Sequence, residues 1–525
     1  MIAHPFARRL RLATLGGLRS SLVAAIAVAL LVTAAAGATA VPPAPLARNA
    51  YQRISSSSEI SADLAALAAA SPLATVTVVG TTVQQRPIEA LRLATGGASR
   101  AASRATVLLV GTQHGAAEPA GGEAMLLLAR ELVAGALRPL LEDLDIVLLP
   151  NVNADGRDLG RRGNAAEVNL NTDFVLASQP ETQAVIAALD RFAPQVVLDV
   201  HESAERKRRT LAREGYLTNF DAQFEVANNP AVPAVLRELA NSILLPALLA
   251  RVSAAGLPAR QYIGEITSTR QAITNGGLSL RNLRNMAGVD GALAFLLETR
   301  LDDRDQSFPT YRNIKARSER VMLALRCFLD LIHEQRAPIL EQVAAARAAL
   351  MKEPVTLYAR YAAAPREARV ELPLQRLPTR ESVTLAFRDH RHIMSAATIA
   401  MPATYVLRGH TEDLLALLDR HKIHYERVSQ PLEVPVLAER FAPPPAADAE
   451  VMLLHSEEQL LRVAHGAVFI DLVQRHGRLV PLLLDPRSNS SVFRAAPYSS
   501  ALVRGGDFPV YRVRKGVIRP PPAAP

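Results

Sequence analysis

Short, continuous apolar runs that alternate with segments of helical periodicity are the feature that most constrains how this chain can fold. The apolar runs cover residues 105–110, 145–149, 195–200 and 293–297. The helical segments cover residues 61–70, 121–136, 180–192, 235–254 and 318–334. Strands that are apolar along their whole length are buried on both faces, and the helices between them cover those faces. Two β-rich runs, 74–79 and 88–93, are separated by Gly80 and a polar turn, which predicts a hairpin. The expected fold class is therefore α/β, a mixed central sheet with helices on both faces.

The pattern changes near residues 345–353, where an alanine-rich helical stretch leads to Pro354. Beyond it, the β-rich segments are 403–407, 450–454 and 479–484. They predict a smaller C-terminal domain, β-rich or α/β. The expected domains are a main domain over 41–350, an accessory domain over 351–518 and a disordered tail over 519–525.

The N-terminus has the pattern of an export signal. Four arginines and no acidic residue lie in the first 40 residues, an apolar run covers 22–36, and Ala38-Thr39-Ala40 offers a small-x-small cleavage site. The apolar run has roughly 15 residues, fewer than the ~20 that a spanning helix needs. We expect a signal peptide over 1–40, a periplasmic or secreted protein, and no stable membrane span after cleavage. An uncleaved membrane anchor is the alternative.

The charge balance argues against a nucleic-acid-binding protein, and the cysteine content excludes a disulfide within the chain. The 525 residues carry a formal charge of +9, and without the first 40 residues 55 basic side chains face 50 acidic ones, or +5. The arginines are dispersed and no basic motif is interleaved with aromatic residues, so no nucleic-acid partner is expected. Cys327 is the single cysteine, which rules out an intramolecular disulfide.

Polar side chains follow the predicted strands at their carboxyl ends. His114, Asn153, His201 and Glu298 each lie at or just beyond the end of a buried run. Ligands of open α/β sheets bind at that edge, so these residues are expected to converge. Two histidines and a carboxylate make a catalytic zinc site with one position open to water. A further carboxylate would take a proton from that water. A metal ion and a general base together are the groups that metal-assisted amide hydrolysis requires.

The motifs between these residues resemble the zinc carboxypeptidases, the carboxypeptidase A-like metallopeptidases, over about residues 51–332. The resemblance rests on Arg86-Pro87-Ile88, Gln113-His114-Gly115, Glu118-Pro119-Ala120-Gly121, Pro150-Asn151-Val152-Asn153-Ala154-Asp155-Gly156, Asn169-Leu170-Asn171, Asp199-Val200-His201-Glu202 and Glu298-Thr299-Arg300. The order and spacing of these short motifs are more specific than any one of them. The C-terminal part resembles a region that follows the catalytic domain of some bacterial, exported members.

The resemblance implies a role for each matching residue. His114, Glu118 and His201 match the zinc ligands, so one Zn²⁺ per chain is expected. Glu298 matches the general base, which deprotonates the water and passes the proton to the leaving amine. Arg162 matches the arginine that polarises the scissile carbonyl and stabilises the oxyanion.

The substrate-binding residues depart from the family pattern. Asn171 matches the asparagine that helps to bind a terminal carboxylate, but Thr172 stands where an arginine clamp is usual. Arg281 or Arg284, in a glycine-rich loop before Glu298, is a candidate replacement. Tyr262 is the nearest candidate for the tyrosine that the family places over the substrate.

Two departures concern the metal ligands. His114 and Glu118 are separated by three residues, where the family has two, and Asn169 stands where an aspartate usually orients the first zinc histidine. Glu202 adjoins a ligand, but neighbouring residues of a strand point to opposite faces, which predicts a structural or outer role.

The expected function is an exported zinc-dependent metallopeptidase of the carboxypeptidase type, acting on peptides or cell-wall peptides. The alternatives are a zinc-dependent deacylase or amidase acting on N-acyl amino acids, which would fit the loss of the clamp, and a catalytically impaired binding protein on a peptidase fold.

Overall fold

The computed structural model describes residues 41–96, 103–204, 210–301, 313–409, 411–444 and 449–513. The predicted signal peptide (1–40) and tail (519–525) lie outside the described residues. In the part of the chain that is described, no helix combines the length and the apolar character that a membrane crossing requires.

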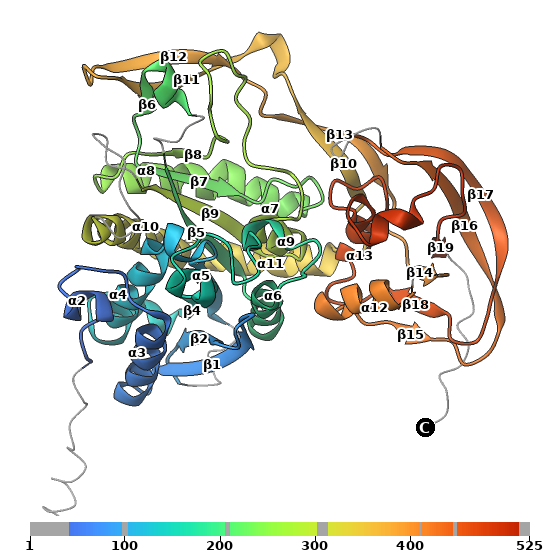
Figure 1. Cartoon of the computed structure of the whole chain (residues 1–525), viewed down its shortest axis with the longest axis horizontal. Coiled ribbons are helices and arrows are strands. Elements are labelled where there is room, and N and C mark those ends of the chain that lie inside the picture. Colours follow the sequence, from blue (N-terminus) through green and yellow to red (C-terminus); the bar gives the residue numbers. More distant parts are fainter. Residues whose placement is uncertain are drawn as a thin grey trace, which may run out of the picture.

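An eight-stranded mixed sheet is the centre of the molecule (Figure 1). Its order is β1-β2-β4-β3-β5-β9-β7-β8. The bounds are β1 (Ala74–Thr81), β2 (Pro87–Leu93), β3 (Ala105–Gly111), β4 (Leu144–Leu149), β5 (Val196–Ser203), β7 (Ala222–Val226), β8 (Ala259–Gln261) and β9 (Leu293–Arg300). β4, β3, β5 and β9 are parallel neighbours, and β1, β2 and β7 pair antiparallel. The predicted α/β class, the hairpin and the buried parallel strands are confirmed.

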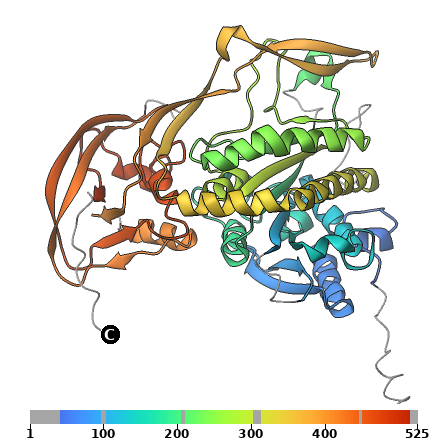
Figure 2. The same cartoon turned by 180° about the vertical axis from the view of Figure 1, so that it is seen from behind.

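Helices cover both faces of this sheet, as the views from the two sides show (Figures 1 and 2). One face carries α4 (Ala120–Ala134), α8 (Leu245–Ala254) and α10 (Ile314–Glu334); the other carries α6 (Pro180–Phe192) and α9 (Leu283–Val289). The remaining helices of this part are α2 (Pro45–Arg48), α3 (Ser57–Ala70), α5 (Ala154–Asp158), α7 (Ala234–Glu238) and α11 (Arg336–Ala349). α3 begins earlier than predicted because Ser56 and Glu59 form a capping box.

The C-terminal part forms a six-stranded antiparallel sheet beside the main sheet, in the order β15-β18-β14-β19-β16-β17 (Figure 1). The bounds are β14 (Thr404–Leu407), β15 (Glu426–Arg427), β16 (Leu432–Ala442), β17 (Met452–Val463), β18 (Val468–Asp471) and β19 (Val510–Val513), with helix α12 (Thr411–Arg420). The prediction of a strand over 479–484 is wrong, because this segment is helix α13 (Leu479–Leu484). A short apolar run that is buried all round has no period that separates strand from helix. Pro481 was the neglected signal, since proline breaks a central strand but is tolerated in the first turn of a helix.

A two-stranded arm links the two parts. β10 (Val355–Ala362) pairs with β13 (His392–Ile399), and the chain between them forms the hairpin of β11 (Arg369–Arg376) and β12 (Ser382–Arg388). β11 also pairs with β6 (Tyr216–Thr218) of the main part. The hairpin thus packs on the main part although it lies beyond residue 351 in sequence. The domain limits of 41–350 and 351–518 stay predictions.

Candidate metal centre and active site

The parallel strands deliver the predicted site residues to one edge of the sheet. His201 of β5 and Glu298 of β9 are register partners on neighbouring strands. His114 follows the end of β3, and Asn153 follows the end of β4. β5 and β9 extend further than the apolar runs suggested, so His201 and Glu298 stand inside their strands rather than after them.

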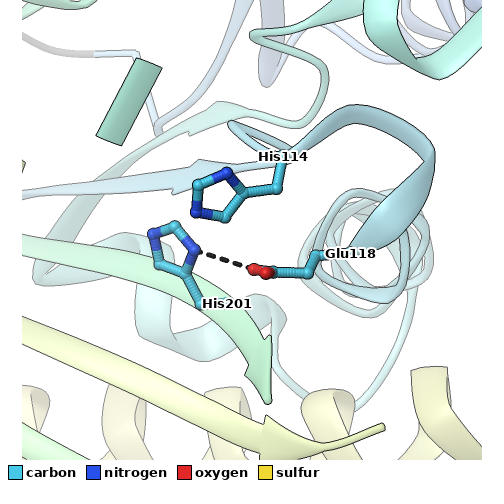
Figure 3. Close-up of side chains that lie close together, drawn as sticks. All are labelled: His114, Glu118 and His201. Atoms are coloured by element: carbon cyan, nitrogen blue, oxygen red, sulfur yellow. Dashed lines mark hydrogen bonds and ion pairs between the residues drawn. The ribbon is translucent and has the colours of Figure 1, made fainter. Parts of the chain in front are cut away.

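Three predicted metal ligands come together in the fold (Figure 3). One nitrogen each of His114 and His201 and one carboxylate oxygen of Glu118 all lie within 4.8 Å of one another. All three side chains are buried, and the two imidazole rings have their centroids 4.9 Å apart. Two imidazoles and one carboxylate are a donor set that zinc takes in catalytic sites, so the triad fits a zinc ion.

The additional residue between His114 and Glu118 is absorbed by a turn of 3₁₀ helix over Gly115–Ala117. Gly115 adopts a positive φ of 51°, and a Cβ at this position would lie 2.5 Å from the Arg161 carbonyl oxygen. Only glycine fits such a position, which combines left-handed backbone with close contact. The turn brings Glu118 back to the two histidines despite the longer spacing.

Buried polar groups brace this turn. The Asn153 side-chain amide donates to the carbonyl oxygens of Gln113 (3.1 Å) and Arg162 (3.2 Å), which joins the two loops that carry His114 and Arg162. Arg157, paired with Glu123 at 2.9 Å, donates to the Pro119 carbonyl at 3.3 Å. The loops beside the metal site are therefore fixed by hydrogen bonds as well as by packing.

The triad is electrostatically prepared for a positive charge. Burial raises the pKa of Glu118, but the charges of His114 and His201 and the hydrogen bond from His201 outweigh it and hold the pKa well below its ordinary range. Burial lowers the pKa of His201, yet Asp199 and Glu118 raise it well above its ordinary value. Two carboxylates thus lie against one imidazole, and both favour a positive charge at His201, either a proton or a metal ion.

Asp199 is a site residue that the sequence analysis did not assign. Its Oδ1 lies 2.9 Å from His201 Nε2, while His201 Nδ1 lies 2.9 Å from Glu118 Oε2. A carboxylate on the second nitrogen of a ligand histidine fixes the ring and raises its basicity. The available signal was the period of the strand, because residues two apart on β5 face the same side.

Arg162 reaches the triad from the opposite loop. Its Nη1 contacts Glu118 Oε1, and its Nη2 lies 2.9 Å from His114 Nε2. About half of its side chain is exposed, at 53%. The guanidinium therefore lies beside the ligand atoms and is partly open to solvent.

Glu202 has a structural role, as its place in the strand predicts. Its carboxylate accepts hydrogen bonds from Arg317 Nε (2.7 Å) and Nη2 (2.8 Å) and from the Ala120 amide (2.9 Å). Both charged side chains are almost completely buried. This pair anchors the first turn of α4, which directly follows the ligand Glu118.

Two cavities that share lining residues lie at the site, and His114 and Glu118 line the smaller one. Asn171, Tyr262 and Glu298 line both a cavity of about 260 Å³ above the metal ligands and a larger cleft of about 900 Å³. Burial and the charge of Glu298 raise the pKa of the Tyr262 hydroxyl, so it stays a neutral donor. Arg162 lines the smaller cavity only.

Arg281 lines the larger cleft beside Thr172. Its Nε donates to the Thr172 carbonyl oxygen at 3.4 Å, and its side chain is exposed. Asn169 caps the short turn that holds Asn171, accepting from the Asn171 amide at 3.2 Å. A basic side chain therefore stands next to the position where the family's clamp is missing.

Comparison with known proteins agrees with this geometry. Residues 60–207 match the family model described as zinc carboxypeptidase. Carboxypeptidase 2 of Trichophyton rubrum is 30% identical over 207 residues, and carboxypeptidase 2 of Trichophyton tonsurans is 31% identical over 207 residues. Each alignment covers 38% of this chain and 38% of the relative, so the chain spans about two fifths of the length of the curated relatives it matches.

Solved structures of carboxypeptidases also align with part of the chain. Carboxypeptidase A from Helicoverpa armigera is 16% identical, with a TM-score of 0.42, and the alignment covers 54% of this chain and 75% of that one. A metallo-carboxypeptidase from Pseudomonas aeruginosa is 22% identical, with a TM-score of 0.41, and the alignment covers 53% and 68%. Taken with the family match, the triad identifies this part of the chain as metallocarboxypeptidase-like, with the His/Glu/His ligand set intact.

Proposed function

We propose that this protein is a zinc-dependent carboxypeptidase that hydrolyses the last peptide bond of peptides with a free C-terminus. The observation that carries the proposal is the buried triad of His114, Glu118 and His201, whose ligand atoms lie within 4.8 Å of one another, with Glu298 in register beside His201. The match of residues 60–207 to the zinc carboxypeptidases supports it.

The residues around the triad divide the chemical work. His114, Glu118 and His201 would hold a zinc ion, which would supply Lewis-acid activation of water and of the scissile carbonyl. The Glu298 carboxylate takes a proton from the attacking water and delivers it to the nitrogen of the leaving amine. Arg162, whose side chain is half exposed at the mouth of the site, turns toward the substrate and stabilises negative charge on the carbonyl oxygen.

The leaving residue occupies the larger cleft. Asn171 donates its amide to the terminal carboxylate, and Arg281 takes the place of the clamp that is absent at Thr172. The support for this assignment is that all three residues line the same cleft, with Arg281 in contact with the Thr172 carbonyl. Tyr262, which lines both cavities, covers the substrate at their junction.

Zinc content and substrate range together test the proposal. Protein purified in zinc-replete buffer is expected to hold about one zinc per chain, and the Glu118→Ala variant is expected to lose it. Glu167→Ala, which breaks only an exposed ion pair with Arg161, serves as the control and keeps the metal. Absence of zinc from the unmutated protein would refute the enzymatic proposal.

Three substrate sets separate the hydrolytic alternatives. Peptides with a free C-terminus are expected to be cleaved, whereas the same peptides with an amidated C-terminus are expected to resist. Faster hydrolysis of N-acyl amino acids than of peptides would instead favour the deacylase, which the missing clamp at Thr172 also fits. Zinc binding without hydrolysis of any set would favour the binding protein.

We further propose that the protein is exported and acts on peptides outside the cytoplasm, cell-wall peptides included. The support is the arginine-led apolar segment and the Ala38-Thr39-Ala40 site of the sequence. Expression of the full chain in a bacterium is expected to yield a periplasmic or secreted form whose N-terminal sequence starts at Val41. Recovery of the intact N-terminus in the membrane fraction would indicate an anchor instead.

A further inference from the structure

The larger cleft contains a buried arginine whose charge has few partners. Arg284 stands in the first turn of α9, lines the cleft and is only 3% exposed. Its Nη2 donates to Asn228 Oδ1 at 3.2 Å, and its buried Nε has no hydrogen-bond acceptor among the residues that the structure describes. A guanidinium carries five N–H donors, and the described residues leave several of those of Arg284 without an acceptor.

Glu225 interacts with this guanidinium through its charge but makes no direct ion pair with it. Glu225 on β7 is also buried, and no ion pair within 4 Å joins it to Arg284 in the described ranges. Burial raises the pKa of Glu225 and disfavours its ionised form, against the opposing charge of Arg284. A buried charge without a close counter-ion is costly in a folded protein. Such a charge beside a substrate cleft suggests that the counter-ion arrives with the substrate.

The C-terminal part of the chain holds this end of the cleft in place. The Tyr361 hydroxyl of β10 donates to the Gly276 carbonyl oxygen (2.7 Å) and accepts from Asn228 Nδ2 (2.9 Å). Ser490 Oγ accepts from the Leu280 amide at 2.9 Å. A Cβ on Gly276 would lie 2.7 Å from Arg284 Nη2, so the loop packs tightly against the guanidinium. The position of Arg284 therefore depends on residues that lie far beyond it in sequence.

The charges along the cleft are distributed unevenly. Its acidic side chains are Asp199 and Glu298, which both belong to the metal end. Its basic side chains are Arg281, Arg284, Arg360 and Arg494. The end of the cleft away from the metal is therefore positive, which suits a leaving residue with more than one carboxylate.

We propose that the cleft selects peptides whose last residue is acidic, with the Arg284 guanidinium binding the side-chain carboxylate of that residue. Tyr361 is a positioning residue, since it holds the loop and Asn228 against Arg284. The inference rests on the proposed function, in which Arg281 binds the terminal main-chain carboxylate. A charge-assisted pair with a planar guanidinium gives both affinity and geometric selection.

Two peptides that are identical except for a final Glu or Gln test this selection, because the two side chains have the same shape and differ in charge. The wild-type protein is expected to cleave the Glu peptide with a kcat/KM roughly tenfold higher. In Arg284→Met, the Glu/Gln ratio of kcat/KM is expected to fall to about 1. Arg281→Ala is the matched control, in which both peptides lose activity and the ratio is kept.

Tyr361→Phe keeps the ring and removes the hydroxyl, so it perturbs the positioning of Arg284 without creating a cavity. The Glu/Gln ratio is expected to fall roughly threefold in this variant. Equal losses for both peptides in Arg284→Met and Tyr361→Phe would show a merely structural role and overturn the inference.

A binding measurement separates this inference from the proposed function. Calorimetric titration of the purified protein with N-acetyl dipeptides ending in Glu or Gln is expected to give affinities that differ by roughly tenfold. Equal affinities, or equal cleavage of the two peptides by the wild type, would overturn the acidic selection while leaving carboxypeptidase activity intact. Preferential binding of the Glu ligand without any peptide hydrolysis would refute the proposed function alone.

Discussion

Replacing Glu202 by alanine is expected to destabilise the protein more than any exposed ion-pair change. The carboxylate accepts three hydrogen bonds, two from Arg317 at 2.7 and 2.8 Å and one from the Ala120 amide at 2.9 Å. The side chains of Glu202 and Arg317 are 0% and 1% exposed. Each hydrogen bond to a charged group contributes about 1.5–3 kcal/mol, and truncating one partner of a buried pair costs about 3–5 kcal/mol. We therefore expect the free energy of unfolding to fall by about 4 kcal/mol, because three buried hydrogen bonds and the ion pair with Arg317 are lost.

Urea unfolding followed by far-ultraviolet circular dichroism measures this loss. Metal-free protein is used, because bound zinc would add its own stabilisation to the wild type. Glu167→Ala, which removes an exposed partner of Arg161, is the control and should cost less than about 1 kcal/mol.

The double variant Glu202→Gln with Arg317→Met keeps an acceptor for the Ala120 amide and removes the buried charge. It should recover about 2 kcal/mol relative to Glu202→Ala. A loss in Glu202→Ala no larger than in the Glu167 control would refute the reasoning that this buried pair anchors α4.

Three further predictions concern the site and its surroundings. Asp199→Asn should weaken zinc binding about 10- to 100-fold in a chelator competition, because the carboxylate next to His201 loses its charge; unchanged affinity would contradict this role. Arg162→Ala should bind zinc at least as tightly as the wild type, because the Arg162 guanidinium no longer competes for Glu118. The kcat of this variant should fall about 10²- to 10³-fold. A loss of zinc in Arg162→Ala would contradict this role of Arg162. Burial lowers the pKa of His421 to about 4 in the folded protein. As pH falls below about 6.5, this histidine is therefore protonated in the unfolded chain before it is in the folded one. The free energy of unfolding is expected to decline by about 3 kcal/mol between about pH 6.5 and pH 4. His421→Asn should lose this part of the pH dependence in urea unfolding, and an unchanged slope would count against it.

The sheet and the metal ligands were accessible to sequence reasoning because their signals are local. The apolar run 105–110 contains β-branched residues and ends at Gly111, which favours a strand where an apolar run alone does not decide. A polar residue after such a strand is placed by the direction of the strand. His114 and His201 could therefore be assigned to one edge before any contact was known. Their partner Asp199 gives no such signal, because it lies inside the apolar run and only the two-residue period of β5 places it on the same side as His201.

The substrate end was less accessible because it depends on contacts between distant segments. In the sequence, Arg281 and Arg284 both follow the same pair of glycines, and no neighbouring residue predicts that only Arg284 is buried. The fold distinguishes the two arginines, because Arg281 is exposed beside Thr172 while Arg284 is buried. The loop that covers Arg284 is held by a hydrogen bond from Tyr361, which belongs to the C-terminal part. Sequence spacing cannot report a hydrogen bond between residues 276 and 361.

The two ends of the site are thus built by different means, and this difference explains where the chain departs from the family pattern. The metal ligands lie on a parallel strand and on a turn that Asn153 and Arg157 hold by hydrogen bonds. Such a fixed turn accommodates the extra residue before Glu118 because Gly115 adopts a left-handed conformation. The cleft beyond Glu298 is lined by the glycine-rich loop, by α9 and by the C-terminal part, which lie outside the parallel strands that carry His201 and Glu298. Loss of an arginine at Thr172 is tolerable there if another arginine reaches the same cleft. The geometry consequently constrains the metal chemistry tightly and leaves substrate selection to the glycine-rich loop, α9 and the C-terminal part.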